Sequence, residues 1–277
     1  MIKKIKNSPR LILLVRNTAN LFYLIQDYLL YFYCFFNKNI YTQDIECTIV
    51  TAADTSHFKS AIQLINSIKK SDKNQKIIFY DLGLTKNEIN KIRSMKNIEV
   101  KYKKFKFENY PNFFRLSEKD AGAYAWKPQI IFDESKLVRG ILLWMDAGDF
   151  VTKPLSMLKK IIIKYGFYSP LSNGYVKQWT YEKTLDALHV KRSLYSKRML
   201  NAAIVGVNTK NLKYMNLFEE WKNLSFNKNI ILPEGAGKNN HRWDQSILTI
   251  LFYQKIRKLF FPRTHKLFGV LTHRDID

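Results

Sequence analysis

Along most of the chain, short apolar runs alternate with segments in which apolar residues recur every three or four positions. The first pattern predicts buried strands and the second predicts amphipathic helices. We expect five strands in one sheet, at residues 47–53, 76–80, 98–102, 141–145 and 202–207. Helices should begin near residues 55, 85, 126, 155, 211 and 244. This alternation predicts an α/β fold with a mostly parallel central sheet flanked by helices.

Two local signals support the predicted helix starts. Thr85 and Glu88 have the spacing of a capping box, in which the hydroxyl accepts from the Glu amide and the Glu side chain reaches back. Pro128 lies in the first turn of the next predicted helix, where proline is tolerated. Residues 106–120 and 227–240 are expected to be loops.

The first 43 residues follow another pattern. Basic residues precede an apolar, aromatic stretch at 21–36, which is short for a bilayer span and contains Asp27. One helical face of that stretch holds Leu21, Ile25, Tyr28, Leu29 and Phe32. The helix either lies in a membrane interface, helped by its basic flank, or packs on the domain as an ordinary helix. We therefore divide the chain into an N-terminal helical extension, 1–43, and an α/β domain, 44–277.

Charge and cysteine content limit the partners and the compartment. The 277-residue chain carries a formal charge of +23 with 35 Lys and only 11 Arg. A nucleic-acid binder favours Arg, whose guanidinium binds bases and phosphates in a bidentate way, so no nucleic-acid partner is expected. Anionic membrane surfaces and anionic nucleotide substrates fit the charge better. Two cysteines without a disulfide pattern favour a cytoplasmic location, at the inner face of the cytoplasmic membrane if the N-terminus binds there.

Asp146 and Asp149 directly follow the most apolar predicted strand. Ligands of open α/β sheets gather outside the carboxyl ends of the strands. Two carboxylates there can surround one hard cation such as Mg²⁺ or Mn²⁺, which in turn binds diphosphates. The alternative is a polar turn that merely ends the strand, since Asp and Gly are common turn residues.

Three further polar segments follow or precede predicted elements. Asp54 ends the first strand and could bind a base or ribose, or could cap the next helix. Asn201 precedes the fifth strand. Asp244 and Gln245 open the last helix, where Asp244 could be only a charge favoured by the helix dipole.

Taken together and in this order, these segments resemble glycosyltransferases of the GT-A fold, especially the glycogenin-like and bacterial lipopolysaccharide galactosyltransferase group. The matching pieces are residues 51–54, 146–149, 201–206 and 244–245. The resemblance implies a Rossmann-like, mixed and mostly parallel sheet, a nucleotide-sugar donor and a Mn²⁺ or Mg²⁺ cofactor. It implies donor binding by Thr51, Ala52, Asp54, Lys127, Asp146, Asn201 and Arg242, catalytic roles for Asp244 and Gln245, and metal binding by Asp146, Asp149 and His273.

The sequence departs from that group at one position. Gly148 stands where the group has the second Asp of its Asp-any-Asp motif, and Asp149 comes one residue later. Either the turn is remodelled so that Asp149 binds the metal, or Asp146 acts with fewer protein ligands. Residues 144–148, Trp-Met-Asp-Ala-Gly, with residues 124–128, Tyr-Ala-Trp-Lys-Pro, before them, also resemble a less characterised set of glycosyltransferase-like proteins of bacterial surface-polysaccharide loci.

The expected activity is transfer of a sugar, from a UDP-sugar, to a saccharide or glycolipid acceptor in surface-polysaccharide synthesis. A divalent cation would neutralise charge on the leaving diphosphate. Asp244 would be the general base of an inverting enzyme, or Asp244 or Gln245 would lie near the reacting carbon of a retaining one. His265 is nearly as good a third metal ligand as His273. The alternatives are a nucleotidyltransferase and a non-catalytic, membrane-associated α/β binding protein.

Overall fold

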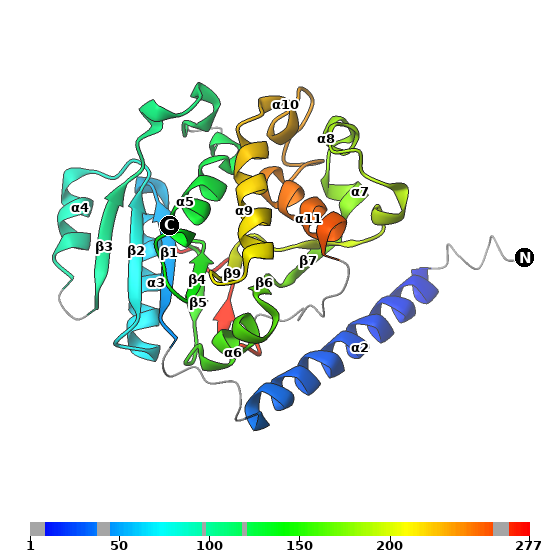
Figure 1. Cartoon of the computed structure of the whole chain (residues 1–277), viewed down its shortest axis with the longest axis horizontal. Coiled ribbons are helices and arrows are strands. Elements are labelled where there is room, and N and C mark those ends of the chain that lie inside the picture. Colours follow the sequence, from blue (N-terminus) through cyan, green and yellow to red (C-terminus); the bar gives the residue numbers. More distant parts are fainter. Residues whose placement is uncertain (1–8, 38–44, 96–97, 118–120, 257–265) are drawn as a thin grey trace, which may run out of the picture.

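The computed structural model describes residues 9–37, 45–95, 98–117, 121–256 and 266–277. Its centre is a six-stranded sheet with the order β3-β2-β1-β4-β9-β6 (Figure 1). β1, β2, β3 and β4 run parallel, whereas β9 is antiparallel to both β4 and β6. The strands are β1 Cys47–Ala53, β2 Lys76–Asp81, β3 Val100–Lys104, β4 Ile141–Met145, β6 Phe167–Tyr168 and β9 Ile204–Asn208. The mixed, mostly parallel α/β sheet predicted from the sequence is confirmed.

Helices cover both faces of this sheet, because consecutive strand residues point to opposite sides. Ile49 belongs to one core cluster and Val50 to the other, and Leu143 and Trp144 divide in the same way. The Ile49 side packs on α3 Phe58–Ser71, α4 Lys86–Arg93 and α6 Ser156–Tyr165. The Val50 side packs on α5 Trp126–Ser135, α9 Leu212–Ser225 and α11 Trp243–Lys255.

The predicted capping box is present. Thr85 accepts from the Glu88 amide, and the Glu88 carboxylate accepts from the Thr85 amide at 2.8 Å. The helix expected at Thr55 instead opens as a 3-10 turn, Thr55–His57, before α3 begins. Both predicted loops were only partly right. Short 3-10 turns lie at Phe107–Asn109 and Asn112–Phe114, and a short helix, α10 Lys228–Ile231, lies in the second loop.

The end of the chain forms a two-stranded sheet with the segment that follows β4. β10 Val270–Leu271 pairs antiparallel with β5 Phe150–Val151, which follows β4 after four residues. A second small sheet, β7 Leu171–Tyr175 with β8 Arg198–Leu200, and two short helices, α7 Val176–Trp179 and α8 Glu182–Ala187, complete the fold. The C-terminal residues therefore lie beside the loop that follows β4.

The N-terminal extension forms one helix, α2 Pro9–Phe36, seen at the lower right of Figure 1. Leu30 and Cys34 are buried against the α6 side of the domain, and Lys160 donates to the Cys34 carbonyl at 2.9 Å. The predicted apolar face is exposed: Leu21, Ile25, Tyr28, Leu29 and Phe32. No helix in the described ranges is both long and apolar enough to cross a bilayer. The boundary at residue 43 lies outside the described residues.

Gly140, which precedes β4, should tolerate no side chain. Its φ is 112°, and a Cβ there would overlap the Glu46 carbonyl and lie 3.1 Å from Ile45 Cγ2. We expect Gly140→Ala to lower the free energy of unfolding by about 1–3 kcal/mol. Urea denaturation measures this effect. Gly237→Ala is the matched control, because nothing lies within 4 Å of its Cβ position; equal losses in the two variants would contradict the argument.

Candidate functional site

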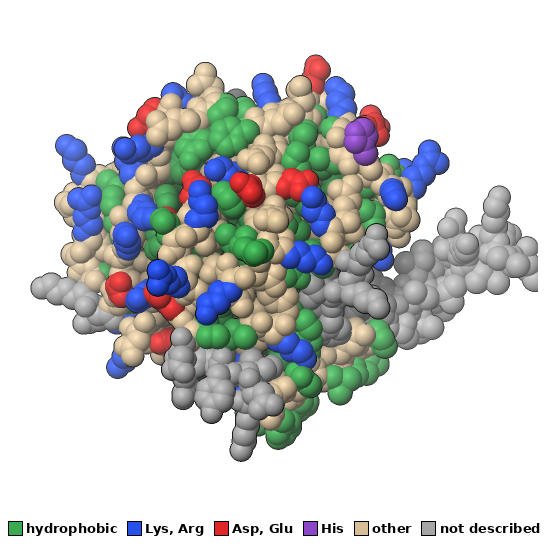
Figure 2. Space-filling view, viewed as in Figure 1, with side chains coloured by type: hydrophobic (Ala, Val, Ile, Leu, Met, Phe, Trp, Pro, Cys, Tyr) green, Lys and Arg blue, Asp and Glu red, His purple; other side chains and the backbone are tan. Residues whose placement is uncertain are grey.

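Polar side chains gather where the parallel strands end. Asp54 follows β1 and Asp146 follows β4, its parallel neighbour, so both lie at the carboxyl edge of the sheet. Figure 2 shows acidic side chains near the middle of one face, with Lys and Arg side chains around them. This is the edge at which open α/β sheets bind ligands.

Lys127 of α5 lies at the centre of the group. Its Nζ is 2.9 Å from Asp146 Oδ1 and 3.7 Å from Asp244 Oδ2, and the residue is 3% exposed. Burial alone lowers the pKa of a lysine, but the two carboxylates outweigh it and hold the pKa of Lys127 above its usual value. One buried ammonium therefore joins α5, the loop after β4 and the start of α11.

Aromatic rings surround this ion pair. Trp144 Nε1 donates to Asp146 Oδ1 at 2.7 Å, so both described contacts of the Asp146 carboxylate use the same oxygen. Lys127 Nζ lies 5.2 Å from the centre of the Tyr124 ring and 5.6 Å from the Trp144 ring. Rings exclude water and attract the cation, which strengthens the charge interactions here.

Three non-glycine residues beside the cluster have left-handed backbone conformations. Ala123 has φ 50°, Tyr124 has φ 52° and Trp243 has φ 39°. The Tyr124 and Trp243 rings contact each other at a tilt of 50°, with centroids 5.7 Å apart. Such conformations cost about 1–3 kcal/mol each and concentrate at functional sites. The strain supports a functional role for the segments that carry Lys127 and Asp244.

Asn201 stabilises the turn before β9, which contacts this cluster. Its Oδ1 accepts from the Ala203 amide at 3.0 Å, and the Ala203 carbonyl accepts from the Asp146 amide at 2.9 Å. Lys127 Nζ donates to the Ala202 carbonyl at 3.5 Å. The structure thus brings Asn201, Lys127, Asp146 and Asp244 together, although they lie far apart in the sequence.

Asp244 is poised to change protonation near neutral pH. Burial raises the pKa of its carboxyl group to about 7; Lys127 opposes the shift and Asp146 adds to it. A carboxyl group with a pKa near the working pH is suited to general acid or base catalysis. Gln245, the next residue, is half-buried at the same helix start, and its carbonyl accepts from Thr249 Oγ1.

Asp149 lies inside the protein. It is 0% exposed, and neither carboxylate oxygen has a hydrogen-bond partner among the described residues. Burial first, and then the Asp146 carboxylate, raise the pKa of Asp149 well above its usual value. His273 is exposed on the C-terminal segment, and its role as a metal ligand stays a prediction. His265 lies outside the described residues.

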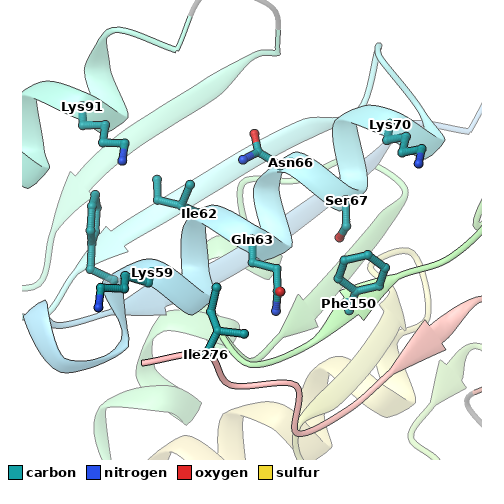
Figure 3. Close-up of a pocket in the computed structure, with 10 residues that line it drawn as sticks. Lys59, Ile62, Gln63, Asn66, Ser67, Lys70, Lys91, Phe150 and Ile276 are labelled. Atoms are coloured by element: carbon teal, nitrogen blue, oxygen red, sulfur yellow. The ribbon is translucent and has the colours of Figure 1, made fainter.

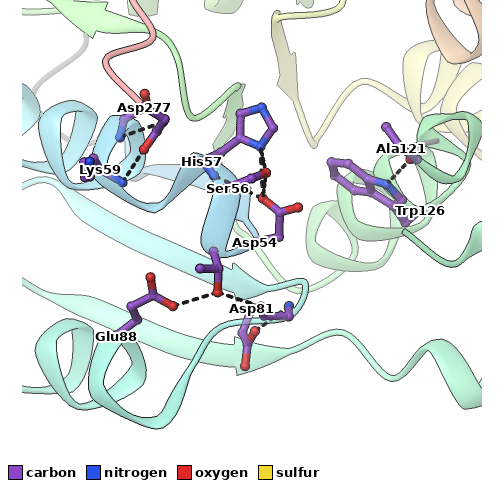
Figure 4. A network of polar contacts seen from close by, with 12 residues as sticks. Asp54, Ser56, His57, Lys59, Asp81, Glu88, Ala121, Trp126 and Asp277 are labelled. Carbon is purple, nitrogen blue, oxygen red and sulfur yellow. Dashed lines mark hydrogen bonds and ion pairs between the residues drawn. The ribbon is translucent and has the colours of Figure 1, made fainter. Parts of the chain in front are cut away.

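The end of β1 is occupied by its own local network (Figure 4). Asp54 Oδ1 accepts from Ser56 Oγ at 2.7 Å and from the His57 amide, and pairs with the His57 ring at 2.9 Å. Burial raises the pKa of Asp54, but the bonds from His57 and Ser56 outweigh it and lower the pKa to about 2. Asp54 therefore caps the 3-10 turn, as one alternative predicted, and its contact with a base or ribose stays a prediction. Thr51 and Ala52 are buried, and Thr51 Oγ1 has no partner in the described chain.

Arg242, two residues before Asp244, has its own set of contacts. Its guanidinium stacks over Trp179 at 3.7 Å and donates to the carbonyls of Lys238 and His241. A cavity of about 510 Å³ also lies elsewhere, along α3, and Phe58, Ile62, Phe150 and Ile276 help to line it (Figure 3). Neither feature includes Lys127, Asp146 or Asp244, so the candidate site is the ion cluster.

Four site residues had no role predicted from the sequence: Tyr124, Trp144, Trp243 and Asp275. Tyr124 and Trp144 lie within the two segments that carry the second resemblance, 124–128 and 144–148. A Cβ at Gly148 would lie 2.6 Å from Asp275 Cγ, which puts this carboxylate on the loop after β4. No local pattern near the end of the sequence could have revealed that contact.

Comparisons with known proteins agree on the fold. A family model described as a protein of unknown function (DUF1647) matches residues 34–132. No curated protein matches the sequence. The bifunctional glycosyltransferase WbbM, in its apo structure, is 18% identical with a TM-score of 0.52, over 79% of this chain and 39% of that chain. The chain therefore spans well under half of that longer protein.

Two other glycosyltransferase structures are similar at lower scores. The galactosyltransferase LgtC, solved with donor and acceptor sugar analogues, is 15% identical with a TM-score of 0.45, over 74% of this chain and 70% of LgtC. Mouse xyloside xylosyltransferase 1 is 8% identical with a TM-score of 0.49, over 78% of this chain and 84% of that one. The likeness to WbbM, with the sheet described above, gives the chain a GT-A-like glycosyltransferase fold.

The Asp244 pKa makes a prediction about stability. Because the folded protein holds this proton more tightly, the stability contribution of Asp244 is complete below pH 3.8 and is lost as the pH rises through about 7. Asp244→Asn does not titrate. Its melting temperature relative to the wild type should therefore rise by several degrees between about pH 4 and about pH 8. Asp186→Asn, at an exposed acid on α8, controls for the change of charge; an equal trend there would contradict the assignment.

Proposed function

We propose that this chain transfers a sugar from a nucleotide-sugar donor, a UDP-sugar, to a saccharide or glycolipid acceptor. The observation that carries the proposal is the buried Lys127 ammonium between Asp146 and Asp244 at the carboxyl edge of a glycosyltransferase-like sheet. That cluster joins a cation for a diphosphate, a partly exposed carboxylate and a carboxyl group that titrates near pH 7. These are the groups that departure of a nucleoside diphosphate and activation of a hydroxyl require.

The acidic residues suit a divalent cation shared with a diphosphate. Among the described residues, no group of three or more His, Cys, Asp or Glu side chains is arranged to hold a metal by itself. Mg²⁺ and Mn²⁺ sites in phosphate chemistry use only one or two carboxylates, and the phosphates and water supply the remaining ligands. Asp146 would hold Mn²⁺ or Mg²⁺, which when bound would neutralise charge on the leaving diphosphate. The burial of Asp149 favours the alternative in which Asp146 acts with fewer protein ligands.

The proposed roles of the other site residues follow from their positions. Lys127 holds the Asp146 carboxylate and adds positive charge near the diphosphate. Asp244, when ionised, accepts the proton of an acceptor hydroxyl or lies beside the reacting carbon with Gln245. The end of β1, at Thr51, Ala52 and Asp54, is assigned to the nucleoside. Asn201 and Arg242 are assigned to the donor sugar and its phosphates, and surface-polysaccharide synthesis is the proposed setting.

The test is release of nucleoside diphosphate from a panel of sugar nucleotides with Mn²⁺. Asp146→Asn keeps the shape of the side chain but removes the charge that attracts the cation, so turnover should fall at least about 100-fold. The far-UV circular dichroism spectrum should keep its shape, because Asp244 and the Ala202 carbonyl still contact Lys127 in this variant. Near wild-type turnover in this variant, or unchanged activity in excess EDTA, would overturn the metal mechanism. Release of pyrophosphate from nucleoside triphosphates would instead favour the nucleotidyltransferase alternative.

We also propose that α2 binds the anionic inner surface of the cytoplasmic membrane. Ten large apolar side chains between Leu21 and Phe36 are exposed on this helix, whereas Leu30 and Cys34 pack on the domain. Basic residues precede the exposed face in the sequence. A helix of this kind lies at the interface with its apolar side in the acyl boundary.

Liposome flotation tests this proposal. Full-length protein should float with vesicles that contain anionic lipid, and a version without residues 1–40 should remain at the bottom. Leu29→Glu with Phe32→Glu should reduce flotation as strongly as the truncation, because both side chains are exposed and neither supports the fold. Leu137→Glu, at an exposed apolar residue outside α2, is the control. If full-length protein floats no better than the truncated form, the proposal is wrong.

A further inference from the structure

Position 148 has room only for a glycine, because another side chain fills the space beside it. It is not among the glycines with positive φ, so its backbone does not require a glycine. A Cβ at this position would overlap Asp275 Oδ1 and lie 2.6 Å from both Cγ and Oδ2 of Asp275. The Asp275 carboxylate therefore occupies the space into which a side chain at position 148 would project.

The C-terminal segment is fixed on both sides of Asp275. The Arg274 amide donates to the Gly148 carbonyl at 2.6 Å, and Gln63 Nε2 donates to the Arg274 carbonyl at 2.7 Å. The Ile276 amide donates to Ser60 Oγ at 2.9 Å. These bonds hold the backbone of residues 274–276 between the loop after β4 and the first turn of α3.

The side chain of Asp277, the last residue, is bound by α3. Its carboxylate accepts from the Lys59 amide at 2.9 Å and from the Ser60 amide at 3.2 Å, as Figure 4 shows for Lys59. These amides belong to the first turn of α3, where a carboxylate satisfies free donors and interacts favourably with the helix dipole. The position of Asp275 thus follows from a docked segment and not from a single contact.

The surrounding charges indicate what Asp275 does there. The Asp149 amide donates to the Asp146 carbonyl at 3.0 Å, and the Asp275 carboxylate lies against Gly148, the residue before Asp149. Asp149 is buried, and neither of its carboxylate oxygens has a partner in the described part of the chain. Three carboxylates thus lie at this loop, and the Lys127 ammonium contacts only Asp146 among them at 2.9 Å in the described residues. Carboxylates crowded in this way are stabilised by a divalent cation.

We propose that Asp275 supplies the second carboxylate of the donor site, at the place that Gly148 leaves open, and pairs with Asp146 around a divalent cation bound to the donor diphosphate. The inference rests on the proposed function. It assigns to a residue 127 positions after Gly148 the role that the resembling glycosyltransferases give to the second Asp of one short motif. The loop after β4 and the docked C-terminal segment then form one site.

The test measures binding and not turnover. Electron paramagnetic resonance of free Mn²⁺ gives the affinity of the full-length protein for Mn²⁺ with UDP, GDP or CDP. Asp275→Asn should weaken this binding at least about tenfold. Asp277→Asn removes the same charge two residues away, on the α3 amides, and should weaken it by less than about threefold. Hydrogen exchange of the Lys59 and Ser60 amides should stay slow in Asp275→Asn, which shows that the segment remains docked.

A second experiment moves the carboxylate from position 275 to position 148. Gly148→Asp alone should displace residues 274–277 and speed exchange of the Lys59 and Ser60 amides, because two carboxylates cannot share that space. Gly148→Asp with Asp275→Gly should restore Mn²⁺–nucleotide binding to within about threefold of the wild type. Equal binding by wild type and Asp275→Asn, or equal losses in Asp275→Asn and Asp277→Asn, would overturn this inference alone. Absence of Mn²⁺–nucleotide binding in the wild type would overturn the proposed function as well.

Discussion

The buried ammonium of Lys127 is the interaction on which the arrangement of the candidate site depends. A charge that is 3% exposed is stable only when its desolvation is balanced by close opposite charges. Asp146 and Asp244 provide that balance from two separate elements, and the Ala202 carbonyl provides a third contact. α5, α11, the loop after β4 and the turn before β9 must therefore all be in place before the cluster forms.

The three carboxyl groups near Lys127 differ in distance and burial. Asp146 is partly exposed and bonded to both Lys127 and Trp144. Asp244 lies farther from Lys127 and is buried, so its pKa rises to about 7. Asp149 is buried beside Asp146 without a partner in the described residues, and burial raises its pKa well above the usual value. Burial and distance from Lys127 thus separate Asp244 and Asp149 from the partly exposed Asp146.

The sequence predicted the sheet well because strand formation here depends on local pattern. The strand Ile141–Met145 was predicted with its observed bounds, since five consecutive apolar residues signal burial on both faces. The strands at 98–102 and 202–207 begin two residues later than predicted, at Val100 and Ile204. Ala202 and Ala203 are apolar because they pack in the turn beside Lys127, which hydrophobicity alone does not distinguish from a strand.

The site could be predicted only where its residues adjoin strands. Asp146, Lys127 and Asp244 each lie beside a recognisable element, and the resemblance to a glycosyltransferase family put them in order. The burial of Asp149 could not be predicted, because an unpaired Asp in a polar turn is almost always exposed. The contact between Asp275 and Gly148 depends on the pairing of β10 with β5, and a two-residue strand leaves almost no pattern in a sequence.

The N-terminal helix and the candidate site meet through Tyr168. This ring is completely buried, and burial, then Asp27 of α2, then Asp149 raise the pKa of its hydroxyl. Asp27 is itself buried, which explains why an otherwise apolar stretch carries an acidic residue at that position. Its carboxyl group turns toward the domain, while Leu21, Ile25, Tyr28 and Leu29 remain exposed on the helix. A helix with this division of faces packs on the domain through Leu30 and Cys34 and leaves its apolar side exposed.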